Sequence, residues 1–126
     1  ADRVLVHGDL GFHNIAIEPG TDELVGVFDY DNAAWADRHQ DFHYLVFDID
    51  AEPELDSALE VYEPAMGVRI DRARVRLCNA ACAISFLAFR YGVPPEVRSC
   101  GRTLEEALRW VRAALSSLGI GVDQPP

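Results

Sequence analysis

The 126-residue sequence contains no lysine, so all 11 of its basic side chains are arginines. It therefore has no lysine to contact nucleotide phosphates. Its N-terminal glycines, Gly8, Gly11, Gly20 and Gly26, also form no G-x-G-x-x-G loop to cover them. If the chain acts on a nucleotide, we expect a separate lobe to supply these two elements.

Cysteine and long apolar runs are also scarce. The three cysteines, Cys78, Cys82 and Cys100, are odd in number and follow no framework spacing, which favours a reducing compartment. We expect Cys78 and Cys82, four residues apart on a helix, to be buried thiols rather than metal ligands or a redox pair. No apolar run approaches the roughly 20 residues of a membrane span, and no signal peptide is visible. The sequence thus predicts a cytoplasmic protein.

Acidic side chains dominate the first half of the chain. Residues 1–66 hold 16 Asp and Glu against 2 Arg, whereas residues 67–126 hold 5 against 9, which together give the net charge of −10. This balance argues against a nucleic-acid partner, because phosphate contacts need clustered basic side chains. It suits metal ions or a cationic substrate, and equally a purely solubilising role. The length fits one domain, residues 1–126.

Carboxylates follow short apolar runs in the first 41 residues. Residues 4–7 and 14–17 are expected strands joined by a loop, and residues 24–28 a third strand that ends before Asp29. The close spacing of the second and third strands favours antiparallel pairing. Asp9, Asn14 and Asp29 would then lie near one edge of a small sheet, as magnesium-dependent phosphoryl transfer requires.

The order of these residues matches a known pattern. His7-Gly8-Asp9 and Asn14 form H-G-D-x-x-x-x-N, and the strand ending at Asp29 and the segment from Asp37 to Phe42 follow in sequence. Over residues 4–43 this resembles the aminoglycoside phosphotransferase and choline kinase family, a variant of the H-R-D and D-F-G set of protein kinases. The resemblance implies a kinase-like fold, of which this chain would be the C-terminal lobe without the N-terminal lobe.

The resemblance also implies roles for individual residues. Asp9 would be the general base, and Asn14 and Asp29 would bind Mg²⁺ against the phosphates of ATP. Three further residues of the pattern would position the site without contacting the substrate, namely His7, Asp37 and Asp41. Each has a simpler alternative, since Asp and Asn commonly make local hydrogen bonds at turns and helix starts.

The rest of the chain is predicted to be helical. Helices are expected over residues 39–47, 54–66, 71–91 and 103–118, after an irregular loop at 30–37. The fold class is therefore α+β, with a small antiparallel β-sheet carrying the catalytic loop (1–37) and a helical bundle (38–122). The third helix is apolar all round from Leu77 to Phe89, which predicts a helix buried on every side. The last begins with a capping box at Thr103 and carries an apolar stripe that includes Leu104, Leu108, Val111, Leu115 and Leu118.

The first functional hypothesis is the catalytic lobe of an ATP-dependent phosphotransferase that phosphorylates a hydroxyl of a small molecule. Its substrate would be aminoglycoside-like or another amino or sugar alcohol, and the isolated chain would be nearly inactive. Acidic residues could line the substrate cleft or form a solvated loop, namely Asp48, Asp50, Glu52 and Glu54. We expect no membrane partner, and a possible homodimer through the surface that faces the absent lobe.

Two alternatives remain open. A kinase-like lobe without its nucleotide-binding partner could be a non-catalytic binding or regulatory module. A metal-dependent hydrolase is weaker: His39 and His43 are spaced as helical ligands, but three ligands would have to converge on one ion.

Overall fold

The first strand pairs with a strand that sequence patterns did not predict. The computed structural model describes residues 3–46, 52–99 and 101–121. Strand β1 (Arg3–Val6) pairs antiparallel with β4 (Ala34–Asp37), placing Leu5 opposite Trp35. The expectation of an irregular loop at 30–37 was wrong, because the segment holds a short 3₁₀ turn, η2 (Tyr30–Asn32), and then β4.

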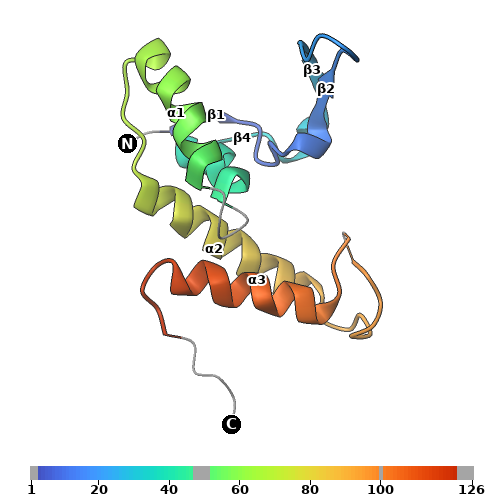
Figure 1. Ribbon diagram of the computed structural model, residues 1–126. Helices are drawn as coiled ribbons and strands as arrows, with labels where there is room; N and C mark the ends of the chain where they lie inside the picture. Colours follow the sequence, from blue (N-terminus) through green and yellow to red (C-terminus); the bar gives the residue numbers. More distant parts are fainter. Residues whose placement is uncertain (1–2, 47–51, 100, 122–126) are drawn as a thin grey trace.

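The second and third strands form the predicted antiparallel pair, but in a separate ribbon. Strands β2 (Ile15–Ile17) and β3 (Leu24–Val27) are joined by a turn in which the Glu18 amide donates to the Glu23 carbonyl at 2.9 Å. A single 3₁₀ turn, η1 (Phe12–Asn14), leads into β2. The chain therefore has two two-stranded ribbons where one sheet was expected. Figure 1 shows the β2–β3 hairpin projecting away from the helices.

The segment after β4 is a 3₁₀ helix, η3 (Arg38–Val46), where a regular helix was expected. Nine residues is long for this conformation, in which side chains three positions apart eclipse one another. The difference matters for the site, because residues of η3 at a spacing of three lie on one face.

Three α-helices follow, close to the predicted ranges: α1 (Glu52–Met66), α2 (Arg72–Phe89) and α3 (Leu104–Ser116). Both predicted N-caps are confirmed. The Asp71 carboxylate accepts from the Ala73 amide at 2.8 Å. Thr103 and Glu106 form a complete capping box. None of the described helices combines the length and apolar character needed to cross a bilayer.

Helix α2 contacts η3 and α3, and it is not buried on every side as predicted. Leu77, Ile84 and Phe89 are exposed at 57%, 49% and 70% of their surface. Since α2 is covered chiefly by η3 and α3, one face of this apolar helix remains at the surface.

The core consists of two clusters. One joins η3 and α1 to the start of α2 and comprises Phe42, Leu55, Leu59, Ile70 and Val75. The other joins α2 to α3 and comprises Ala80, Ala83, Trp110, Val111 and Ala114.

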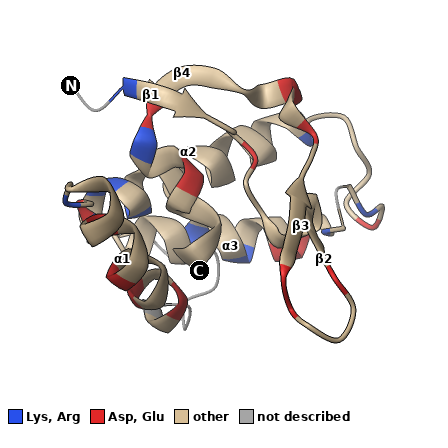
Figure 2. Cartoon of the chain, turned by 90° about the horizontal axis from the view of Figure 1, so that it is seen from above, with Lys and Arg blue, Asp and Glu red and all other residues tan. Residues whose placement is uncertain are grey.

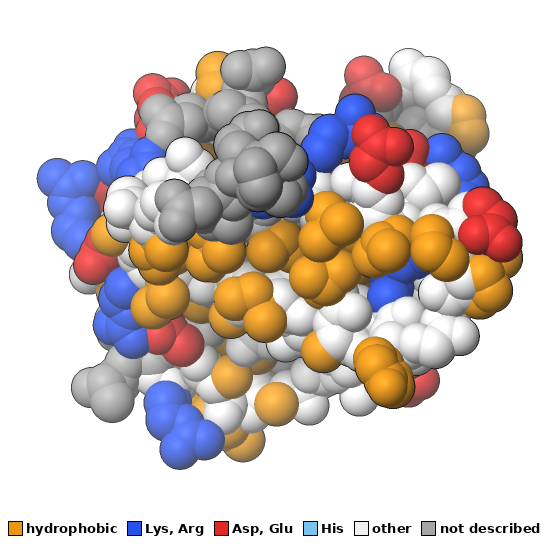
Figure 3. Space-filling view, turned by 90° about the horizontal axis from the view of Figure 1, so that it is seen from below, with side chains coloured by type: hydrophobic (Ala, Val, Ile, Leu, Met, Phe, Trp, Pro, Cys, Tyr) orange, Lys and Arg blue, Asp and Glu red, His pale blue; other side chains and the backbone are white. Residues whose placement is uncertain are grey.

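The stripe predicted on α3 packs against α2 in part, since Val111 is buried and Leu115 and Leu118 lie against the second cluster. Its leucines flank the buried face and stay half-exposed, because the Trp110 ring occupies the interface and its Nε1 donates to buried Asn79 at 3.2 Å. Hydrophobic side chains form a band across the face seen in Figure 3, on the side of the molecule where α3 lies. Acidic positions follow the β2–β3 hairpin (Figure 2), whereas five of the 11 arginines lie on α2 and α3.

Candidate active site

The H-G-D loop turns at Gly8, which has a φ of +83°. A Cβ atom built at this position would lie 2.4 Å from the carbonyl oxygen of Asn32, a distance that real Cβ atoms do not show. Left-handed backbone and close approach both require glycine. The glycine that distinguishes H-G-D from H-R-D therefore has a physical reason in this chain: the loop lies directly against the end of η2.

Asp41 on η3 holds the loop from below. Its Oδ2 accepts from the His7 amide at 2.9 Å and its Oδ1 from the Gly8 amide at 2.8 Å. Hydrogen bonds to an ionised acceptor are roughly twice as strong as neutral ones, so this pair fixes the backbone immediately before Asp9. These contacts are of the kind that the resemblance implied for Asp41.

His7 connects the loop to the end of β3. Its Nδ1 accepts from the Asp9 amide at 3.3 Å, and its Nε2 lies 2.9 Å from the carbonyl oxygen of Phe28. The carbonyl can only accept, so the ring carries its proton on Nε2. The imidazole is buried and stacks at 4.6 Å against Tyr30. His7 thus brings the segment before Asp29 next to the loop.

Asp9, the candidate general base, has a donor at each carboxylate oxygen. Tyr44 donates its hydroxyl to Oδ1. At Oδ2, Asn14 Nδ2 lies at 3.2 Å and His13 Nε2 at 3.5 Å. Burial raises the pKa of Asp9, but the hydrogen bonds from Tyr44, His13 and Asn14 outweigh it, so the pKa lies below its ordinary value of 3.8. The carboxylate is therefore ionised at neutral pH.

Asn14 is buried, and its amide orientation follows from its partners. Nδ2 donates to both the backbone carbonyl and the carboxylate of Asp9, which leaves Oδ1 as the free oxygen of the side chain. The Asn14 carbonyl accepts from the Phe28 amide at 3.1 Å. This bond brings the backbone of Asn14 within one residue of Asp29.

Asp29 adopts a left-handed conformation, with φ 63° and ψ 64°. This conformation is uncommon for a residue other than glycine and concentrates at functional sites. Within residues 3–46, 52–99 and 101–121, its carboxylate has no hydrogen-bond or ion-pair partner. An exposed, unpartnered carboxylate, one residue beyond the Phe28 amide that bonds to Asn14, is of the type that Mg²⁺ binds, since this ion takes one or two carboxylates and completes its shell with substrate oxygens and water.

Asp37 makes its contacts away from the loop. Its Oδ1 accepts from the backbone and ring of His39, and its Oδ2 from Arg74 on α2. The other ring nitrogen of His39 accepts from the Asp71 amide at 3.0 Å. Asp37 therefore joins the end of β4 to η3 and α2, and it contributes to the packing of these elements without contacting the loop.

These contacts remove the main support for the hydrolase alternative. Both ring nitrogens of His39 are engaged, and His43 Nδ1 lies 2.6 Å from the Gln40 carbonyl oxygen. Across the part of the chain that the structure describes, no three His, Cys, Asp or Glu side chains are grouped as a metal site. The zinc site considered for His39 and His43 is therefore not formed.

The candidate cleft residues Asp48 and Asp50 lie outside the described residues, and so does the side chain of Glu52. Sequence reasoning missed two partners of Asp9, namely Tyr44 and His13. His13 precedes Asn14 in the loop, which marks it as a neighbour of the base. Tyr44 follows Asp41 by three residues, a spacing that places both on one face of a helix and could have indicated its position.

Comparison with known proteins identifies the family to which the chain belongs. Residues 1–78 match the model of the phosphotransferase enzyme family APH. The chain belongs to that family.

Among its relatives is the streptomycin 3''-kinase of Streptomyces griseus, which is 34% identical over 96 residues. The alignment covers 76% of this chain and 28% of that kinase. No solved structure matches the chain.

Proposed function

We propose that the chain is the catalytic lobe of an ATP-dependent kinase that phosphorylates a hydroxyl of a small molecule. One observation carries the proposal: an ionised Asp9 is bonded to Asn14 on a loop held by Asp41, and backbone contacts at Phe28 join this loop to the segment that carries Asp29. The family membership and the name of the Streptomyces relative support the same reaction class.

In this proposal Asp9 orients the substrate hydroxyl and accepts its proton as the phosphoryl group is transferred. A low pKa keeps the carboxylate ionised before transfer, so that it can accept a hydrogen bond from the substrate hydroxyl and orient it. Asn14 Oδ1 and Asp29 would hold Mg²⁺, and the bound ion would neutralise charge on the phosphates. His7 and Asp41 keep these side chains at fixed separations, so that positioning supplies most of the rate.

The substrate class we propose is an aminoglycoside-like molecule or another amino or sugar alcohol. The surplus of 14 negative charges over residues 1–66 would attract such a cation. Because ATP is the donor, we place the reaction in the cytoplasm. The lysine and glycine-rich loop that this reaction also needs must come from another segment, since the sequence contains neither.

A non-catalytic binding or regulatory module is the second candidate. The absence of lysine favours it for the chain by itself. The bond from Asn14 to an ionised Asp9 favours catalysis, because phosphoryl transfer needs a carboxylate that is held in place to orient the substrate hydroxyl.

Phosphoryl transfer distinguishes the two. The chain alone should hydrolyse ATP very poorly. When it is joined to the N-terminal segment of the Streptomyces kinase that precedes the matched region, we expect Mg²⁺-dependent phosphorylation of an aminoglycoside. Asp9→Ala and Asp29→Asn should abolish transfer, whereas Asp22→Asn, at the exposed tip of the β2–β3 turn, should retain it.

Three results would contradict the proposal. Strong kinase activity of the chain alone would show that a second lobe is unnecessary. Transfer that survives Asp9→Ala in the joined protein would remove Asp9 as the base. Failure of the joined protein to bind Mg²⁺ and ATP, despite folding, would favour the module.

A further inference from the structure

We propose that Tyr44 is the positioning residue for Asp9, fixing the direction of its carboxylate by donating a hydrogen bond to Oδ1. The inference rests on the proposed function, in which Asp9 is the base. It adds a residue that lies outside the H-G-D-x-x-x-x-N pattern and comes from a different element of the fold.

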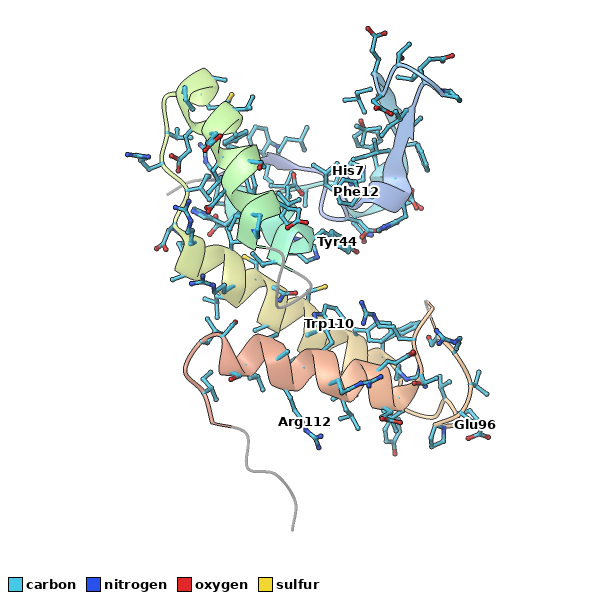
Figure 4. The ribbon with its side chains drawn as sticks, viewed as in Figure 1. His7, Phe12, Tyr44, Glu96, Trp110 and Arg112 are labelled. Atoms are coloured by element: carbon cyan, nitrogen blue, oxygen red, sulfur yellow. The ribbon has the colours of Figure 1, made fainter. Side chains whose placement is uncertain are left out.

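The position of Tyr44 on η3, three residues after Asp41, brings its side chain to the loop. In a 3₁₀ helix residues i and i+3 lie one above the other, so Asp41 and Tyr44 project from the same face. Asp41 holds the backbone amides of His7 and Gly8, and Tyr44 holds the side chain of Asp9. One face of η3 thus fixes both the main chain of the loop and its reactive group. Figure 4 shows Tyr44 on η3, facing the loop that carries His7 and Phe12.

The ring of Tyr44 is itself held between two histidines. His13 meets it edge-on, with ring centroids 5.3 Å apart, and buried His43 lies at 4.2 Å on a tilted ring. Gly11 makes the first contact possible. A Cβ at this position would lie 2.4 Å from His13 Cε1 and 3.4 Å from Tyr44 Cδ1. The tyrosine therefore has little freedom to turn away from Asp9.

Tyr44 and Asn14 approach different oxygens of Asp9, and this divides the carboxylate into two tasks. Oδ2 faces Asn14 and His13, on the side where the candidate metal ligands lie. The lone pair of Oδ1 that Tyr44 does not use is then left for a substrate hydroxyl. Without the tyrosine, the carboxylate can rotate about its Cβ–Cγ bond. Oδ1 and Oδ2 can then exchange places, and neither is reserved for the substrate hydroxyl.

Other titratable groups also face this cluster, and they must be separated from Tyr44 in any test. From the loop there is His13, and from η3 there are Asp41 and His43. Burial lowers the pKa of His43, although its contact with Gln40 and the charges of Asp9 and Asp41 oppose this. From α2 there is Cys82, whose thiol pKa is raised by burial and by the charge of Asp9.

The test is a ¹³C NMR pH titration of the chain itself. The Cγ resonance of Asp9, assigned by its loss in Asp9→Asn, is followed in the wild type, in Tyr44→Phe and in Tyr91→Phe. Tyr91 is 95% exposed, so its variant is a matched loss of a hydroxyl. We expect the Asp9 midpoint to move to higher pH in Tyr44→Phe only, because the hydrogen bond stabilises the ionised form.

A second measurement needs no substitution. The Cζ resonance of Tyr44 in the wild type should show a step at the midpoint of Asp9, since ionisation of the acceptor polarises the donor. An unchanged Asp9 midpoint in folded Tyr44→Phe, or a flat Cζ curve, would overturn the proposal. If Tyr44→Phe does not fold, the Cζ curve alone decides.

Both measurements are made without nucleotide, metal or substrate. A positive titration together with no phosphoryl transfer would therefore reject the proposed function and retain the contact. Phosphoryl transfer without the titration steps would reject the contact between Tyr44 and Asp9 and retain the proposed function.

Discussion

Asp41→Asn is the substitution that most directly tests how the H-G-D loop is held. Asp41 is half-buried, and its two oxygens accept from the amides of His7 and Gly8 at 2.9 and 2.8 Å. Asparagine has the same shape but only one acceptor. Its NH₂ group would face one of the two backbone N–H groups, so that hydrogen bond is lost. The other hydrogen bond remains, but its acceptor is a neutral amide oxygen instead of a charged carboxylate.

The cost follows from these two bonds. A hydrogen bond to a charged group contributes about 1.5–3 kcal/mol, and a neutral one about 0.5–1.5 kcal/mol. Losing one charged bond and weakening the other gives a decrease of roughly 2–4 kcal/mol in the free energy of unfolding. For a domain of this length that corresponds to a fall in Tm on the order of 10 °C. Domains of ordinary stability, about 5–15 kcal/mol, would remain folded.

Urea and thermal unfolding followed by circular dichroism measure the effect. The matched control is Asp31→Asn. Asp31 is exposed and has no hydrogen-bond or ion-pair partner among residues 3–46, 52–99 and 101–121, so its change should stay within about 0.5 kcal/mol. If Asp41→Asn and Asp31→Asn unfold together, the two amide bonds do not hold the loop, and Asp41 has no part in placing Asp9.

Two further outcomes are expected. Burial raises the pKa of Asp37, but its contacts with His39 and Arg74 outweigh this, so the pKa lies below 3.8. A depressed carboxyl pKa adds stability that is present above pH 3.8 and is lost as pH falls through the pKa of the folded state. Asp37→Asn should therefore reduce the slope with which the free energy of unfolding falls at acid pH. An unaltered slope would contradict this. The cross-strand pair Leu5 and Trp35, exposed at 66% and 68%, lies on a two-stranded ribbon with open edges, which predicts self-association of the chain. Sedimentation should show it strengthening with salt as the charge of −10 is screened, and a monomer at both low and high ionic strength would exclude it.

Local signals in the sequence predicted the parts of the fold that local interactions determine. Asp71 and Thr103 mark helix starts because a side-chain oxygen satisfies nearby amides whatever lies around it. The β2–β3 pair was predictable from the turn between its strands. Strand β4 was not, because its partner β1 lies far earlier in the chain and the segment itself reads Ala-Trp-Ala-Asp, without a β-branched residue.

The site divides in the same way. The order of Asp9, Asn14 and Asp29 is visible in the sequence, and the structure brings Asn14 against Asp9 and against the residue before Asp29. The contact of Tyr44 with Asp9 joins residues 35 positions apart, so it depends on how η3 packs against the loop, which no local pattern predicts. Exposure of Leu77 could not be predicted either, since an apolar residue shows which surface it can bury and not whether the chain provides a cover.

The β2–β3 hairpin meets the H-G-D loop at its base, where the His7 ring contacts the Phe28 carbonyl. The Phe28 amide donates to the Asn14 carbonyl at 3.1 Å, so this backbone bond closes the base of the hairpin between the two candidate ligand residues. Asn14 precedes one strand and Asp29 follows the other. An ion held by both side chains would therefore also hold the two strands together at their base, and its removal would loosen the hairpin there.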